Sequence, residues 1–223
     1  STIHIVEGAV TNNVPQCQHA IISNNTVGPA GTPDGHWADG ISLSCGNSTV
    51  SGNQITDATD GAIVVFGAPG SLIENNMVIA STRNLLGGIN MVDYAPVNGN
   101  YSGTVVTNNT IDAQGALIKV GLAMGPEVWW CQSPAEINTG GTVTNNILEG
   151  AHMGYGYAVS GVSNWTVTGN VDNSTHVGTP NAGCGGNVSA PAGFQVDSTY
   201  TNSSMLQSQF VPATLFYLLG ISD

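Results

Sequence analysis

The stretch "VVTNNTI" (residues 105–111) sets two asparagines between short β-prone segments, and close copies of it recur along the chain. The copies are "IISNNTV" (21–27), "TVSGNQI" (49–55), "LIENNMV" (72–78), "TVTNNIL" (142–148) and the degenerate "TVTGNV" (166–171). The repeated position is occupied by Asn25, Asn53, Asn76, Asn109, Asn146 and Asn170, at separations of 28, 23, 33, 37 and 24 residues. Self-similarity at such a period indicates a solenoid.

A second phrase, a glycine or alanine followed by alternating aliphatic residues, lies between the copies of the first. It reads "DGISL" (39–43), "DGAIVV" (60–65), "GGINMV" (87–92), "GALIKV" (115–120) and "GYAVSGV" (156–162). A unit of about 23 residues with two or three short strands cannot bury its apolar side alone, but it can when stacked on its neighbours. We therefore expect an all-β protein, a single parallel β-helix of about seven coils.

The repeat also predicts the domain organisation and the role of the asparagines. We expect one domain over residues 1–223, with repeat coils over about 9–198 and a C-terminal cap over about 199–223, where the apolar end "SQFVPATLFYLLGISD" departs from the repeat. Each repeated asparagine is expected at a sharp bend, with its amide hydrogen-bonded to the equivalent asparagine one coil away. The longer separations of 33 and 37 residues then mark coils with inserted loops.

Composition excludes several classes of partner. Among 223 residues only Arg83 and Lys119 are basic, and the formal net charge is −12. Nucleic acids and anionic membrane surfaces need a basic footprint, so neither is an expected partner. No apolar run approaches the roughly 18 residues of a membrane span, and the start "STIHIVEG" does not have the pattern of a signal peptide, which is typical of a mature or trimmed product. We expect a monomer.

Cysteines and glycosylation motifs favour a secreted protein. Four cysteines without Cys-x-x-Cys spacing fit two disulfides in an oxidising compartment, and of the three pairings we favour Cys17 with Cys45 and Cys131 with Cys184. Eight Asn-x-Ser/Thr motifs are present, at Asn24, Asn47, Asn100, Asn108, Asn164, Asn173, Asn187 and Asn202. The density of these motifs favours a eukaryotic, fungal-like glycoprotein.

The repeat pattern over about residues 9–198 resembles the right-handed β-helices of the pectin lyase-like superfamily, which includes polygalacturonases and pectate lyases. "WADG" resembles the first polygalacturonase motif through Asp39, "TDG" the second through Asp60, and "LIK" the fourth through Lys119. The stretch at the third motif, "LLGGIN", has no histidine, and Leu117 stands where the family has arginine. The resemblance implies a carbohydrate-active site on one face of the solenoid without implying a galacturonide substrate.

Asp39 and Asp60 are the candidate catalytic residues. Neighbouring coils lie about 4.8 Å apart, so two acids at one phase of the repeat form a row on one face. Paired carboxylates split their pKa values and so supply an acid and a base, as glycosidic cleavage requires. We expect Asp60 as general acid and Asp39 as base or nucleophile. The alternative is that each aspartate only caps the start of its strand.

Other side chains are expected to contact a polysaccharide or oligosaccharide substrate. The loop "TPDGHWADG" supplies an aromatic ring that suits the C–H face of a sugar. Lone cations suit substrate oxygens, with surface ion pairing as the alternative. One of the two tryptophans in "GPEVWWCQSP" (125–134) is expected to form a wall of the groove and the other to plug the solenoid. The expected contacts are Asp34, His36, Trp37, Arg83, Asp93, Tyr94, Lys119 and Trp130.

Two further functions stay open. A Ca²⁺-dependent polysaccharide lyase would use Asp39, Asp57 and Asp60 as oxygen ligands; a hydrolase needs no cofactor, and the scattered histidines do not have zinc spacing. A non-catalytic glycan-binding or cell-surface protein would use the aromatic loops without the acid pair. A glycoside hydrolase is the favoured prediction.

Overall fold

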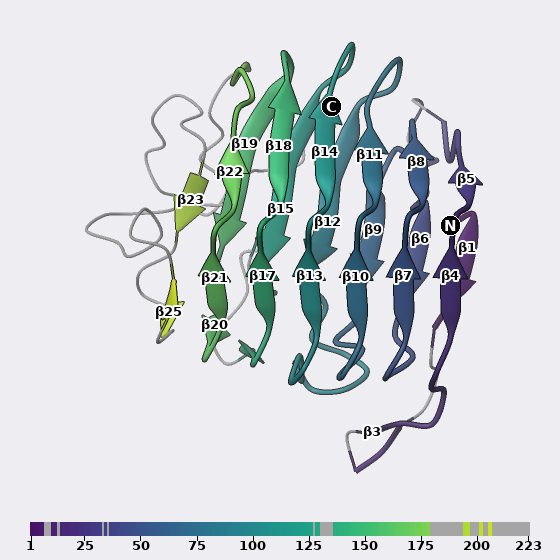
Figure 1. Ribbon diagram of the computed structural model, residues 1–223, viewed down its shortest axis with the longest axis vertical. Helices are drawn as coiled ribbons and strands as arrows, with labels where there is room; N and C mark the ends of the chain where they lie inside the picture. The colour runs from purple at the N-terminus through teal and green to yellow at the C-terminus, as the bar shows by residue number, and fades with distance from the viewer. Residues whose placement is uncertain are drawn as a thin grey trace.

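The computed structural model describes residues 1–6, 10–12, 14–32, 34, 36–126, 128–129, 136–178, 194–196, 201–202 and 205–206. In these residues the chain forms short strands joined by turns (Figure 1). They contain no helix long and apolar enough to cross a membrane. The all-β prediction is confirmed.

Three long parallel sheets run along the solenoid, and each of the first six coils contributes one strand to each sheet. Sheet 1 consists of β1 (Ile3–Ile5), β6 (Ile41–Leu43), β9 (Gly61–Val65), β12 (Leu85–Met91), β15 (Ile118–Met124), β19 (Met153–Val159) and β23 (Phe194–Val196). Sheet 2 consists of β4 (Ile21–Ser23), β7 (Thr49–Ser51), β10 (Leu72–Glu74), β13 (Val105–Thr107), β17 (Thr142–Thr144), β21 (Thr166–Thr168) and β25 (Met205–Leu206). Sheet 3 consists of β5 (Thr26–Val27), β8 (Gln54–Thr56), β11 (Met77–Ile79), β14 (Thr110–Ala113), β18 (Ile147–Gly150) and β22 (Val171–Asp172).

Two smaller pairings complete the described strands. A short parallel sheet consists of β16 (Asn138–Thr139), β20 (Val162–Ser163) and β24 (Thr201–Asn202), and β2 (Val10–Thr11) pairs antiparallel with β3 (Val14–Pro15). The strands of the three long sheets stack in chain order from the N-terminal coil, as Figure 1 shows. Parallel pairing extends to Met205–Leu206, past residue 198 where the sequence pattern places the last coil. The other residues of the expected cap, 199–200, 203–204 and 207–223, lie outside the described residues.

The core is built from stacked rows of aliphatic side chains. In sheet 2, Val50, Ile73 and Val106 are paired in register on successive coils, and all three are fully buried. Sheets 1 and 3 supply similar rows, such as Ile41, Ile63 and Ile89. Burying one such side chain stabilises the fold by roughly 1.5–3 kcal/mol. The apolar positions of the repeat therefore recur because each one buries an aliphatic side chain in the core, and this burial stabilises the fold.

The predicted asparagine ladder is confirmed. Each of the first five repeated asparagines donates from Nδ2 to Oδ1 of the equivalent residue on the next coil, over 2.8 to 2.9 Å, which links Asn25 through to Asn170. Asn76 shows the complete pattern, because its Nδ2 also donates to the Val50 carbonyl at 3.0 Å and its Oδ1 accepts from the Asn53 backbone N–H at 3.0 Å. The ladder thus satisfies buried polar groups inside the turn.

The residue before each ladder asparagine makes the bend. Asn75, Asn108 and Asn145 have positive φ angles of 54°, 54° and 57°, and Gly52 and Gly169 occupy the same place in their coils. Asparagine and glycine adopt this left-handed conformation at the least cost, which explains the Asn-Asn and Gly-Asn pairs of the repeat.

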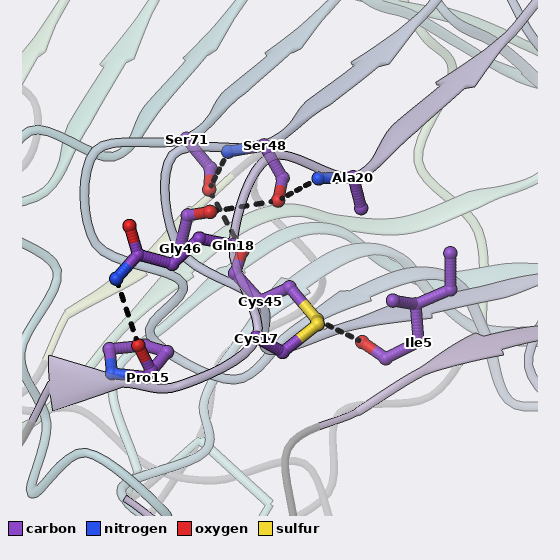
Figure 2. The surroundings of a disulfide bond; sticks show 9 residues. All are labelled: Ile5, Pro15, Cys17, Gln18, Ala20, Cys45, Gly46, Ser48 and Ser71. Atoms are coloured by element: carbon purple, nitrogen blue, oxygen red, sulfur yellow. Dashed lines mark hydrogen bonds between the residues drawn. A yellow bond between two sulfur atoms is a disulfide. The ribbon is translucent and has the colours of Figure 1, made fainter. Parts of the chain in front are cut away.

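One predicted disulfide, Cys17–Cys45, is confirmed. It joins the first two coils beside a short serine ladder, shown in Figure 2: Ser48 Oγ accepts from the Ala20 N–H at 3.0 Å, and Ser71 Oγ accepts from the Ser48 N–H at 2.9 Å. Cys131 and Cys184 lie outside the described residues.

Replacing Asn76 with alanine is expected to lower the free energy of unfolding by on the order of 3 kcal/mol, because it removes four hydrogen bonds and leaves neighbouring buried groups unpaired. Urea denaturation measures the change. The matched control is Asn75→Gly, which alters the exposed neighbour at a φ that glycine adopts freely and is expected to change stability little. Equal losses in the two variants would contradict the ladder's role.

Candidate functional site

A cavity of about 300 Å³ opens on the outer face of sheet 1, over β9 and β12. Three carboxylates, three aromatic rings and one amide line it together with aliphatic side chains. The lining residues are Trp37, Asp39, Asp60, Val64, Phe66, Leu86, Asn90, Val92, Asp93 and Trp129. The structure thus brings together the two predicted catalytic aspartates and two of the predicted contacts, Trp37 and Asp93.

Asp39 is held just before β6 by three donors. Its Oδ2 accepts from the Ser42 hydroxyl at 2.7 Å and from the Ser1 hydroxyl at 3.4 Å, and its Oδ1 accepts from the Gly61 backbone N–H at 3.1 Å. The expectation that Asp39 and Asp60 share one phase of the repeat is wrong by one residue. Ile41 pairs with Ile63, and this register places Asp39 opposite Gly61. Two residues along the chain lead from Asp39 to Ile41, but three lead from Asp60 to Ile63.

Asp60 is fixed through its backbone between two coils. Its N–H donates to the Ala38 carbonyl at 3.2 Å, and its carbonyl accepts from the N–H groups of Leu86 and Gly87 at 3.1 Å. Its side chain is half-buried, and burial together with the nearby charge of Asp39 raises the pKa of Asp60 to about 6. The Asp60 carboxyl therefore keeps its proton in mildly acidic solution.

Asp93, at the end of β12, is the third carboxyl group. Burial raises its pKa to about 7, and the charges of Asp39 and Asp60 add to the effect. Asp60 and Asp93 therefore both keep their protons to a higher pH than an exposed aspartate does.

Aromatic side chains form the sides of the cavity. Trp37 is 38% exposed, as expected of a ring on the "DGHW" loop. Trp129 lines the cavity and also packs against an outer apolar cluster of Val120, Ala123, Val128, Tyr155 and Ala158. Val128 and Trp129 therefore cover outward side chains of β15 and β19. The sequence predicts one of these two tryptophans, Trp129 and Trp130, as a wall of the groove, and the structure places Trp129 there; Trp130 lies outside the described residues.

Asn90 is a cavity residue that the sequence pattern did not reveal. It is only 4% exposed, and a side chain at either Gly61 or Gly87 would overlap its amide, since a Cβ there would lie 2.9 and 1.9 Å from amide atoms. The two glycines of successive coils therefore make room for Asn90. The one available signal was the asparagine after the glycine pair in "LLGGIN", which falls outside the ladder phase.

Several predicted contacts do not line the cavity. Asp34 and His36 form an exposed pair at 3.1 Å, with hydrogen bonds from Thr32 and His36 lowering the pKa of Asp34. The guanidinium of Arg83 donates to the Gly31 carbonyl. Tyr94 packs beside Gly99, and Lys119 is half-buried in β15. Both cations and Tyr94 are thus absent from the cavity lining.

Asp57, the third expected Ca²⁺ ligand, is committed to a turn. Its carboxylate accepts from the backbone N–H groups of Ser81 and Thr82 at 2.7 and 2.9 Å and from the Thr82 hydroxyl at 2.6 Å. Burial opposes its ionisation, but these bonds together hold the pKa of Asp57 below its usual value. The expected set of Asp39, Asp57 and Asp60 is not brought together, and no group of three or more acids, histidines or cysteines in the described part of the chain is arranged to hold a metal ion.

The predicted glycosylation motifs lie mostly in turns. Among the described side chains, the motif asparagines are exposed except for Asn100, which is half-buried and accepts from the Ser102 N–H at 3.0 Å. Asn187 and the side chain of Asn202 lie outside the described residues. The exposed members are Asn24, Asn47, Asn108, Asn164 and Asn173.

Comparison with protein families matches residues 11–172 to the right-handed β-helix region family. The chain belongs to this family. The matched residues contain the whole asparagine ladder and all three cavity carboxylates. No curated protein and no solved structure matches the chain. The family includes enzymes and proteins without catalytic activity, so the fold alone leaves the function open.

The raised pKa values of Asp60 and Asp93 predict a loss of stability as pH rises. Both groups bind protons more tightly in the folded chain than at the unfolded value of 3.8, so ionising them between about pH 4 and pH 7 disfavours the folded state. Asp60→Asn and Asp93→Asn are each expected to raise the free energy of unfolding at pH 8 by roughly 1–3 kcal/mol, after allowance for solvent screening.

Thermal unfolding over a pH series measures this difference between variant and parent. Asp34→Asn removes one equally charged group on an exposed loop and serves as the control. A gain that is the same at pH 4 and pH 8 would contradict the origin assigned to it.

Proposed function

We propose that this chain is a secreted glycoside hydrolase that cleaves a polysaccharide in the cavity on sheet 1. The observation that carries the proposal is the convergence of Asp39 and Asp60, in unlike surroundings, on one cavity with aromatic sides. Two carboxyl groups with separate tasks are what glycosidic cleavage requires. The family to which the chain belongs is compatible with this chemistry but does not specify it.

Asp60 is the general acid in this proposal. A pKa of about 6 leaves its carboxyl protonated in mildly acidic surroundings, so it has a proton to give to the leaving oxygen of the glycosidic bond. Its backbone hydrogen bonds to two neighbouring coils fix the strand from which the carboxyl projects. Positioning of this kind is a large part of an acid catalyst's effect.

Asp39 is the base or nucleophile. Donation by Ser42 and Gly61 orients its carboxylate and supports negative charge on it. Trp37 and Trp129 offer flat faces on which sugar rings stack, which positions the scissile bond between the acids. Arg83 and Lys119 have no part in this mechanism, because neither lines the cavity.

Asp60→Asn is expected to lower kcat/KM by about 100-fold or more, since amide nitrogen cannot supply the proton. Release of reducing ends from a panel of neutral and charged polysaccharides measures it. In the parent, kcat/KM is expected to fall as pH rises above about 6, where Asp60 loses its proton. Asp34→Asn, outside the cavity, should keep the parental rate, and an Asp60→Asn variant of parental activity would overturn the assignment.

Two outcomes of the same assay identify other functions. A Ca²⁺-dependent lyase loses activity in chelator and yields unsaturated ends that absorb in the ultraviolet, whereas the hydrolase keeps its activity. A glycan-binding protein releases no products, keeps its affinity in Asp39→Asn and Asp60→Asn, and loses it in Trp37→Ala.

A further inference from the structure

The cavity offers acceptors to a ligand and few donors. Its described charged lining groups are Asp39, Asp60 and Asp93, and no lysine, arginine or histidine of the described chain is among the lining residues. A second, independent feature points the same way: Oδ1 of Asn90, which is 4% exposed, has no hydrogen-bond partner among the described residues. A buried acceptor without a donor costs free energy until a ligand supplies one.

The sides of the cavity favour a cation as well. Trp37, Phe66 and Trp129 present three aromatic rings to the same space as the carboxylates. Ring faces attract a positive charge, most strongly where water is displaced. Acceptors and rings together are the environment in which proteins bind organic ammonium groups.

The arrangement does not fit a compact metal ion. A metal draws its oxygen ligands to about 2–2.6 Å, and the described residues contain no group of three or more acids so arranged. A cavity of about 300 Å³ instead accepts a ligand of sugar size whose positive charge lies among carboxylates that do not meet at one point.

We propose that the cavity holds a subsite for the protonated amine of an amino sugar, with Asp93 and the Oδ1 of Asn90 as acceptors. The substrate class is therefore a cationic glycan with free 2-amino groups, a deepening that rests on the proposed hydrolase function of the same cavity. A lysine side chain of a peptide carries the same ammonium group, but the flat walls of Trp37 and Trp129 favour a ring over a flexible chain.

Charge then decides between related glycans. A uronic acid chain places carboxylates against three acids and is repelled. An N-acetylated chain has the size and hydroxyl groups of the cationic one but no charge. Ammonium bound beside Asp93 also favours the ionised form of this carboxyl, whose pKa is raised in the free protein, so binding releases protons from Asp93.

Isothermal titration calorimetry of the full chain at about pH 6 and low salt tests the subsite with four probes: trimers of glucosamine, N-acetylglucosamine, galacturonic acid and lysine. The glucosamine trimer is expected to bind about tenfold or more tightly than the N-acetylated trimer. Titration in two buffers of different ionisation heat should show protons released by the glucosamine trimer and fewer by the N-acetylated one.

Asp93→Asn and Asn90→Ala are expected to remove most of this preference, whereas Asp34→Asn, which changes the net charge equally outside the cavity, retains it. Thermal unfolding verifies that each variant is folded. The proposal is overturned by equal binding of the two glucosamine-based trimers, by preferred binding of the galacturonic acid trimer, by failure of every probe to bind, or by a preference that survives Asp93→Asn and Asn90→Ala together. A lysine trimer that binds as tightly as the glucosamine trimer overturns the assignment to a sugar.

Cleavage is scored separately on the same glycans. Preferred binding of the amine without release of reducing ends supports the subsite and counts against the hydrolase. Cleavage of neutral chains without any preference for the amine supports the hydrolase and overturns the subsite.

Discussion

The amide ladder from Asn25 to Asn170 is the constraint on which the rest of the fold depends. Each ladder residue pairs only with its counterparts one coil away, so the ladder fixes the stacking of coils without fixing the number of residues in each. Coils of 23 and of 37 residues therefore have the same core. The longer coils differ in the segments between their strands, and one such segment carries Trp129 to the cavity.

The periodic part of the fold was predictable from the sequence because the turns and the core repeat. The ladder, the parallel sheets and the Cys17–Cys45 bond follow from residues that recur at one phase. The cavity was predictable only in part, since its parts do not repeat: Asp39 and Asp60 share a sequence motif yet lie one residue out of register. Asn90 depends on glycines of two different coils, and the orientation of Arg83 towards Gly31 has no sequence signal.

The electrostatics of the cavity follow from where the few charges lie. A chain with two basic residues and fourteen acidic ones has little local means of neutralising a buried carboxylate. Asp57 is stabilised instead by backbone N–H groups, whereas Asp60 and Asp93 remain near other acids and their pKa values rise. Asp57 and Asp60 are three residues apart but differ in role: Asp57 is a structural hydrogen-bond acceptor, whereas Asp60 is an acid with a raised pKa.

The Cys17–Cys45 bond has a mechanical consequence. A solenoid whose coils contact only their neighbours peels most easily from an end, one coil at a time. The bond ties the first coil to the second, and the second coil carries Asp39 just before β6. Peeling from this end therefore cannot separate those two coils while the bond is intact, so the coil that carries Asp39 stays attached to the coil before it.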